Sequence, residues 1–113
     1  ATYAAKILKD TGHIDWAKTS RQILYLINGT DPTPGAYLIY QDEKIKCFRP
    51  EILTWKGPEK PGTILIADDR DGLVIKTEDS ALKIDEVQAP GKKRMGATVF
   101  LRGKKLEMGT VLN

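Results

Sequence analysis

The segment Asp31-Pro32-Thr33-Pro34-Gly35 divides the chain into two parts with different hydrophobic patterns. Its two prolines lack amide donors and bias the residues before them toward extended geometry, so a helix cannot continue through the segment. Before it, apolar side chains recur at helical spacing from Ile23 to Ile27. After it, the apolar runs are short and turn residues separate them. We therefore predict one helix, over about residues 20–28, followed by a series of strands.

Both ends of the predicted helix carry sequence signals. Thr19, followed three residues later by Gln22, matches a capping box, in which each side chain bonds the backbone amide of the other residue. Gly29 stands where a residue in the left-handed conformation commonly ends a helix, so we expect the helix to end there. Residues 1–18 show no clean period and are expected to form an extended lead-in.

Five apolar runs after the proline segment have the length and bounding turns of strands. They are residues 36–41, 44–49, 63–67, 73–77 and 81–87, and residues 106–112 are a candidate sixth. The run 44–49 alternates apolar and polar side chains, as a half-buried strand does. Met95, Val99 and Phe100, followed by Gly103, indicate a short helical turn near residues 97–102.

Strands of this number and length favour a mainly β fold. Without helices they cannot cover both faces of an open sheet, and closure into a barrel also removes exposed sheet edges. The chain of 113 residues has the length of one domain, which we assign to residues 1–113, with the barrel over 36–113. We predict a small OB-like β-barrel of five or six strands with the helix packed on one side.

Residues for catalysis or metal binding are scarce. The chain has one histidine, His13, and one cysteine, Cys47, which excludes an internal disulfide and the usual Cys/His zinc site. We interpret His13 as a surface or partly packed residue, and Cys47 as a small buried hydrophobe in its strand. The acidic cluster at residues 68–71 lacks the ligand spacing of a calcium loop and is interpreted as a solvated hairpin turn. We predict no catalytic, cofactor or metal site in this chain.

The clearest chemical signal is positive charge near the C-terminus. Residues 89–113 hold six basic side chains and one acidic one, whereas residues 31–88 hold eight basic and twelve acidic. The candidate nucleic-acid-binding residues are the six cations Lys92, Lys93, Arg94, Arg102, Lys104 and Lys105. Such a group can neutralise phosphates and gives affinity without reading sequence. The alternative is that these side chains only keep a loop soluble. The aromatic residues Phe48 and Phe100 are expected in the core rather than as stacking platforms.

Several short motifs in a fixed order give the chain a family resemblance. They are residues 1–7, Ile14-Asp15-Trp16, Gln22-Ile23, Ile27-Asn28-Gly29, Pro34-Gly35-Ala36-Tyr37, Pro61-Gly62-Thr63-Ile64, Pro90-Gly91-Lys92-Lys93-Arg94-Met95, Phe100-Leu101-Arg102-Gly103, Leu106-Glu107 and Gly109-Thr110. Together they resemble the C-terminal domain of methionyl-tRNA formyltransferase over essentially the whole chain. At Gly96 such domains commonly have a serine, so the short helix after it is expected to lack a side-chain cap.

The resemblance implies a division of labour within a longer enzyme. It implies an N-terminal Rossmann-like domain, in cis, that transfers formyl from the cosubstrate 10-formyltetrahydrofolate to methionyl initiator tRNA. It also implies that this barrel helps to hold the tRNA through Lys92, Lys93 and Arg94, with Arg102 next; Lys104 and Lys105 are added on charge alone. We expect a cytoplasmic location and no membrane or metal partner.

Two other roles are weighed against tRNA binding. The chain resembles the structural C-terminal barrels of sugar-nucleotide formyltransferases and of the hydrolase part of 10-formyltetrahydrofolate dehydrogenase, which do not bind tRNA. The dense cationic run 92–94 favours the tRNA enzyme. Independent catalysis by this chain is not expected.

Overall fold

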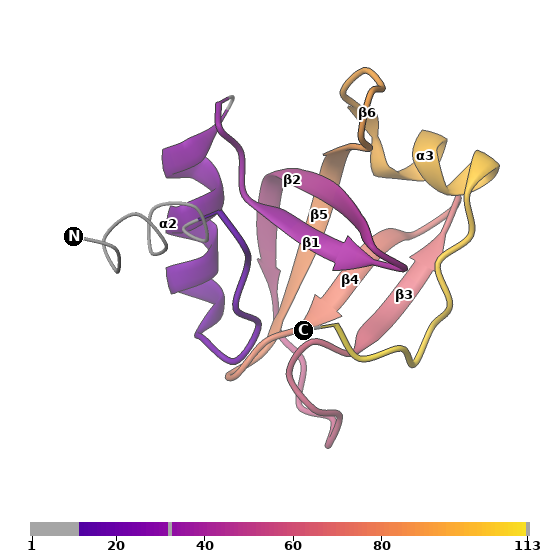
Figure 1. Cartoon of the computed structure of the whole chain (residues 1–113). Coiled ribbons are helices and arrows are strands. Elements are labelled where there is room, and N and C mark those ends of the chain that lie inside the picture. Colours follow the sequence, from indigo (N-terminus) through magenta and orange to yellow (C-terminus); the bar gives the residue numbers. More distant parts are fainter. Residues whose placement is uncertain (1–11, 32, 113) are drawn as a thin grey trace.

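The computed structural model describes residues 12–31 and 33–112 and shows a curled β-sheet with one helix on its side (Figure 1). An extended lead-in was expected over residues 1–18, of which residues 1–11 lie outside the described residues. Within the described part, His13 forms an isolated bridge to Tyr37. The elements are α2 (Ser20–Thr30), β1 (Tyr37–Tyr40), β2 (Glu43–Leu53), β3 (Ile64–Asp68), β4 (Gly72–Lys76), β5 (Ala81–Gln88), β6 (Met95–Gly96) and α3 (Ala97–Gly103).

The sheet is antiparallel, with strand order β1-β2-β5-β4-β3, and the short β6 pairs with β5. It curls into a half-barrel whose two edge strands are β1 and β3 (Figure 1). The prediction of a mainly β, barrel-like fold with an N-terminal helix and a short later helix is confirmed. The two-residue β6 was not predicted, because a pair of residues carries no readable period.

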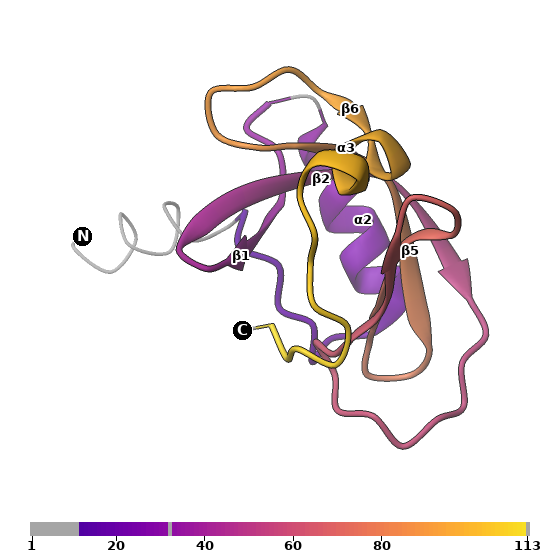
Figure 2. The same ribbon diagram turned by 90° about the vertical axis from the view of Figure 1, so that its right-hand side faces the viewer.

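The C-terminal segment lies between the two edge strands. Ile64 on β3 donates from its amide to Thr110 O (2.8 Å), and Leu112 donates to Gly62 O (2.8 Å). On the other side, the amide of Glu107 donates to the hydroxyl of Tyr40 on β1 (3.1 Å). The candidate sixth strand over residues 106–112 therefore does not form as a strand, and makes one bridge, between Thr63 and Val111. Figure 2 shows this segment running beside the sheet.

Helix α2 begins as predicted but ends later. Thr19 is the N-cap, and its capping box with Gln22 is complete. The expected stop at Gly29 is wrong, because the helix continues to Thr30 and its C-cap, Asp31, is extended rather than left-handed. Thr30 Oγ1 donates to Leu26 O (2.8 Å), which satisfies a carbonyl in the last turn. A left-handed glycine is therefore not needed to end this helix.

The core is built from the helix and the inner surface of the sheet. Ile23 and Ile27 on α2 are buried, and α2 packs mainly on β2. Cys47, Phe48 and Phe100 are buried, as the sequence predicted. Gly96 is the N-cap of α3 and provides no side-chain hydrogen bond to the helix, as expected.

The turn between β3 and β4 is the hairpin turn that the acidic cluster predicted. Asp68 accepts hydrogen bonds from the amides of Arg70 and Asp71, so its carboxylate organises the turn. These bonds hold the pKa of Asp68 below its usual range. Among the described residues, none of the helices has the length and apolar character to cross a membrane.

Candidate nucleic-acid interface

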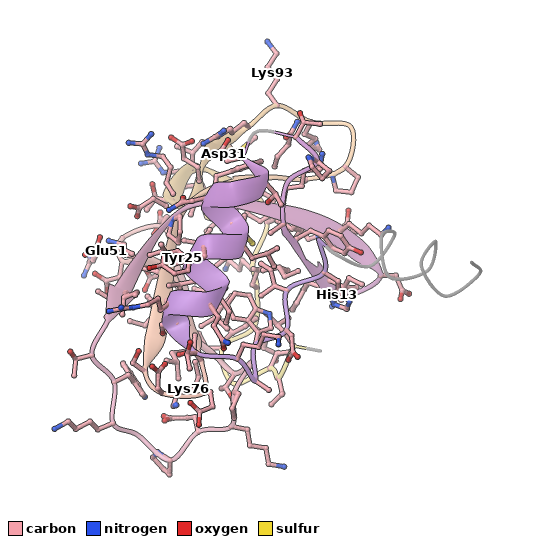
Figure 3. All side chains as sticks on the ribbon, turned by 90° about the vertical axis from the view of Figure 1, so that its left-hand side faces the viewer. His13, Tyr25, Asp31, Glu51, Lys76 and Lys93 are labelled. Atoms are coloured by element: carbon pink, nitrogen blue, oxygen red, sulfur yellow. The ribbon has the colours of Figure 1, made fainter. Side chains whose placement is uncertain are left out.

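The cationic run predicted from sequence lies in the loop between β5 and β6. The Lys92 amide donates to Ala89 O (3.1 Å), and the Gln88 side chain donates to Lys92 O (2.9 Å). These two bonds tie the loop to the end of β5. The side chains of Lys92 and Lys93 are exposed, and Lys93 projects away from the body of the domain (Figure 3).

Arg94 differs from the two lysines before it. Its guanidinium donates to both carboxylate oxygens of Asp31 (2.8 and 3.2 Å) and to Glu86 Oε1 (2.6 Å). The group also lies over the ring of Phe48, with Cζ 3.9 Å from the centroid. Asp31, and less strongly Glu86, raise the pKa of Arg94. Arg94 therefore directs its charge toward protein carboxylates and joins the end of α2 to β2 and β5.

The later cations lie on two separate grooves. Arg102 and Lys105 line a groove of about 800 Å³ between α3 and the end of β3, where Arg102 Nε is 4.0 Å from Asp69 Oδ2. Lys92 and Lys104 line a second groove, of about 520 Å³, in which Lys104 pairs with Glu43. The structure thus brings Lys92 and Lys104 together and separates them from Arg102 and Lys105.

Two further lysines lie beside the loop, and the sequence analysis did not select them. Lys44 and Lys46 on β2 line a groove of about 390 Å³ with the loop residues 89–91. They were overlooked because charge was counted by segment, and residues 31–88 are acidic overall. The signal that identifies them is the Lys-Ile-Lys-Cys alternation, which puts both lysines on the same face of a strand.

The one histidine and the one cysteine of the chain are both packed against other residues. The ring of His13 stacks on Tyr37, with centroids 5.4 Å apart and planes 6° apart. Cys47 is fully buried, and burial raises the pKa of its thiol to about 12, so the nucleophilic thiolate is scarce at neutral pH. Within residues 12–31 and 33–112, no three His, Cys, Asp or Glu side chains gather as metal ligands.

A curled antiparallel half-barrel with a helix on its side defines a small OB-like domain, and the cationic loop lies between β5 and β6. Residues 6–105 match the family model described as formyl transferase, C-terminal domain. The chain belongs to this family.

The curated relatives support the same family and point to one enzyme within it. The chain is 38% identical over 112 residues to methionyl-tRNA formyltransferase from Caldanaerobacter subterraneus subsp. tengcongensis, covering 99% of this chain and 36% of the relative. It is 40% identical over 112 residues to methionyl-tRNA formyltransferase from Desulfotalea psychrophila, covering 99% of this chain and 34% of that relative. The resemblance to the C-terminal domain of this enzyme is confirmed, and the chain spans about a third of the length of these relatives.

A solved structure has the same fold at lower identity. The crystal structure of HypX from Aquifex aeolicus in complex with tetrahydrofolic acid matches with a TM-score of 0.64 and 21% identity. The match covers 87% of this chain and 20% of the HypX chain. At this identity the likeness shows the fold alone.

Proposed function

We propose that this chain is the tRNA-binding accessory domain of a methionyl-tRNA formyltransferase. In that protein an N-terminal Rossmann-like domain, in cis, transfers formyl from 10-formyltetrahydrofolate to methionyl initiator tRNA. The C-terminal domain supplies electrostatic affinity for the tRNA and no reacting group. This role in translation initiation belongs in the cytoplasm.

The observation that carries the proposal is the loop with Lys92 and Lys93. Both side chains are exposed, and among the described residues neither is paired with a carboxylate. Unpaired lysines can neutralise phosphates without first losing a protein partner, and phosphate contacts supply sequence-independent affinity. The relatives named for methionyl-tRNA identify tRNA as the polyanion to test.

The test is the salt dependence of tRNA binding by this chain. With about 3–5 phosphates engaged, the plot of log K against log salt has a slope of roughly −3 to −5. Changing Lys92 and Lys93 to Ala reduces the slope by about 1 for each phosphate that is no longer neutralised. The matched control changes Lys56 and Lys60 to Ala, two exposed lysines in the loop before β3. Equal affinity at 50 and 300 mM salt contradicts the proposal.

A structural role without tRNA binding is the second candidate. The observation that favours it is that Arg94, Arg102 and Lys104 each lie within 4.0 Å of a carboxylate of the same domain. Such pairs direct these cations toward carboxylates of the domain itself and leave less charge for a partner. This role predicts no shift of tRNA in a gel at any salt concentration.

A further inference from the structure

The β1–β2 hairpin carries a second set of cations next to the loop between β5 and β6. Lys44 and Lys46 lie two residues apart on β2, so their side chains leave the same face of the strand. Lys46 is paired in register with Gln88 of β5. The side chain of Gln88 in turn bonds Lys92 O, which brings the cationic loop to the end of this strand pair.

The groove between hairpin and loop shares the lining residue Ala89 with the groove that holds Lys92 and Lys104. Residues 89–91 form one wall of the groove at Lys44 and Lys46, and Ala89 also lines the groove at Lys92 and Lys104. Two shallow grooves therefore meet at one short loop. A nucleic-acid backbone that follows the loop would therefore pass between the cations of the two grooves.

The two lysines are held in position without being neutralised. Lys44 Nζ lies 5.0 Å from the centroid of the Tyr37 ring, a cation–π arrangement that leaves its N–H groups free for an anion. The stem of Lys46 passes over Gly35, where an added Cβ would be only 3.0 Å from Lys46 Cδ. Among the described residues, neither ammonium forms an ion pair. Asp42 is the one carboxylate in the lining of this groove.

We propose that Lys44 and Lys46 bind backbone phosphates of the same RNA that the Lys92–Lys93 loop binds, and that the RNA path crosses the groove between them. This inference rests on the proposed function. It extends the RNA surface from the C-terminal segment onto the β1–β2 hairpin. Over the two grooves and the loop, five lysines stand against the two carboxylates Asp42 and Glu43. This net positive charge gives the face the field that attracts a phosphodiester chain.

The experiment compares three double variants of this chain in salt-dependent tRNA binding. Changing Lys44 and Lys46 to Gln is expected to weaken binding about 10-fold at low salt and to reduce the salt slope by about 2. Changing the same residues to Arg keeps the charges and is expected to restore binding. Changing Lys56 and Lys60 to Gln removes two exposed lysines elsewhere and is expected to leave the slope nearly unchanged.

A labelling experiment on the unchanged chain guards against misfolded variants. Lysine acetylation with and without tRNA, read by mass spectrometry, is expected to show protection of Lys44, Lys46, Lys92 and Lys93 and none of Lys56. If Lys44 and Lys46 are labelled as fast with tRNA as without it, while Lys92 and Lys93 are protected, this inference is overturned and the proposed function stands. If the chain shows no salt-sensitive tRNA binding at all, both are overturned.

Discussion

Arg94 binds Asp31 across 63 positions of sequence, with two guanidinium–carboxylate hydrogen bonds of 2.8 and 3.2 Å. Asp31 is the C-cap of α2, and Arg94 ends the cationic loop, so the pair fixes that loop against the helix. The paired side chains are 31% and 26% exposed, so water weakens the interaction only partly. Arg94 therefore acts as an anchor from which Lys92 and Lys93 extend into solvent.

Changing Arg94 to Ala is expected to lower the free energy of unfolding by about 1–2 kcal/mol, because two carboxylates lose their hydrogen-bond partner. Arg94→Lys is expected to recover only part of this loss, since an ammonium cannot make the bidentate bond. Urea denaturation measures both effects, with Arg70→Ala as the control for an exposed arginine. A double-mutant cycle with Asp31→Ala that gives no coupling energy would show that the pair does not stabilise the domain.

Ser20 is a buried polar residue whose hydroxyl joins the start of α2 to the β4–β5 turn. Its Oγ lies 2.6 Å from Thr77 Oγ1 and 2.8 Å from Ser80 Oγ. Ser20→Ala is expected to destabilise the domain by about 1–3 kcal/mol, because two hydroxyls lose a buried partner. Thr54→Ala, at an exposed position, is the control. Thermal unfolding that changes equally in both variants contradicts a role for this network.

The sequence predicted the features that depend on neighbouring residues. The capping box at Thr19, the turn at Asp68 and the burial of Cys47 all follow from local patterns, and all three are confirmed. The predicted end of α2, at residue 28, was two residues too early. The helix continues to Thr30, whose hydroxyl bonds a carbonyl in the last turn, and it does not end at a left-handed Gly29. Local propensity allows both endings, and the sequence contains nothing that chooses between them.

The candidate site depends even more on contacts between residues that are distant in sequence, which local patterns do not predict. A run of three cations looks uniform in sequence, yet Arg94 is separated from Lys92 and Lys93 by contacts with Asp31 and Glu86. Those partners lie 63 and 8 positions away, and only the folded chain brings them to the guanidinium. Lys44 and Lys46 join the basic loop through the pairing of β2 with β5, which a segment-by-segment charge count does not represent.

Cys47 is expected to be unreactive in the folded domain. Its thiol is fully buried, and burial raises its pKa to about 12, so little thiolate forms at pH 8 and reagents cannot reach the sulfur. Ellman's reagent is expected to react slowly with the native chain and rapidly in denaturant. Rapid reaction with the native chain at pH 8, while its circular dichroism is unchanged, would contradict this packing.

Asp79 makes the stability of the domain depend on pH. Its carboxylate accepts a hydrogen bond from the amide of Ser20 at the start of α2 (2.9 Å), and this bond holds the pKa of Asp79 below its usual range. Because the folded pKa is depressed, the ionised group stabilises the fold above about pH 4. This contribution is lost as the pH falls from about 4 through the lower folded pKa.

Asp79→Asn is expected to lower stability at pH 7 by about 0.3–1 kcal/mol, the range for an exposed charge at a helix N-terminus. The gap between the variant and the unchanged chain should narrow as the pH falls below about 4 toward the folded pKa of Asp79, because protonation removes the charge that the variant lacks. Urea titrations from pH 2 to 7 measure the gap, with Glu51→Gln as the control for removal of one exposed carboxylate. A gap that stays constant across this range would exclude the charge as its cause.

Substitutions at Gly62 and Gly109 can distinguish the effect of backbone strain from the effect of opening the barrel. Both glycines have positive φ, 94° and 90°, so a side chain at either costs about 1–2 kcal/mol in conformational strain. A Cβ at Gly62 would also lie 2.5 Å from Leu112 O, whereas a Cβ at Gly109 would meet nothing within 4 Å. Gly62 is thus a point of close backbone contact between the barrel and the C-terminal segment.

Gly62→Ala is therefore expected to destabilise the domain more than Gly109→Ala. The additional destabilisation in Gly62→Ala is expected because the backbone at Leu112 must move, and its amide then loses the hydrogen bond to Gly62 O (2.8 Å). Hydrogen exchange of the Leu112 amide is expected to accelerate in Gly62→Ala, because that amide loses its acceptor, and to change less in Gly109→Ala. Equal destabilisation by the two substitutions, with equal exchange at Leu112, would mean that strain alone acts and that the C-terminal segment does not hold the barrel closed.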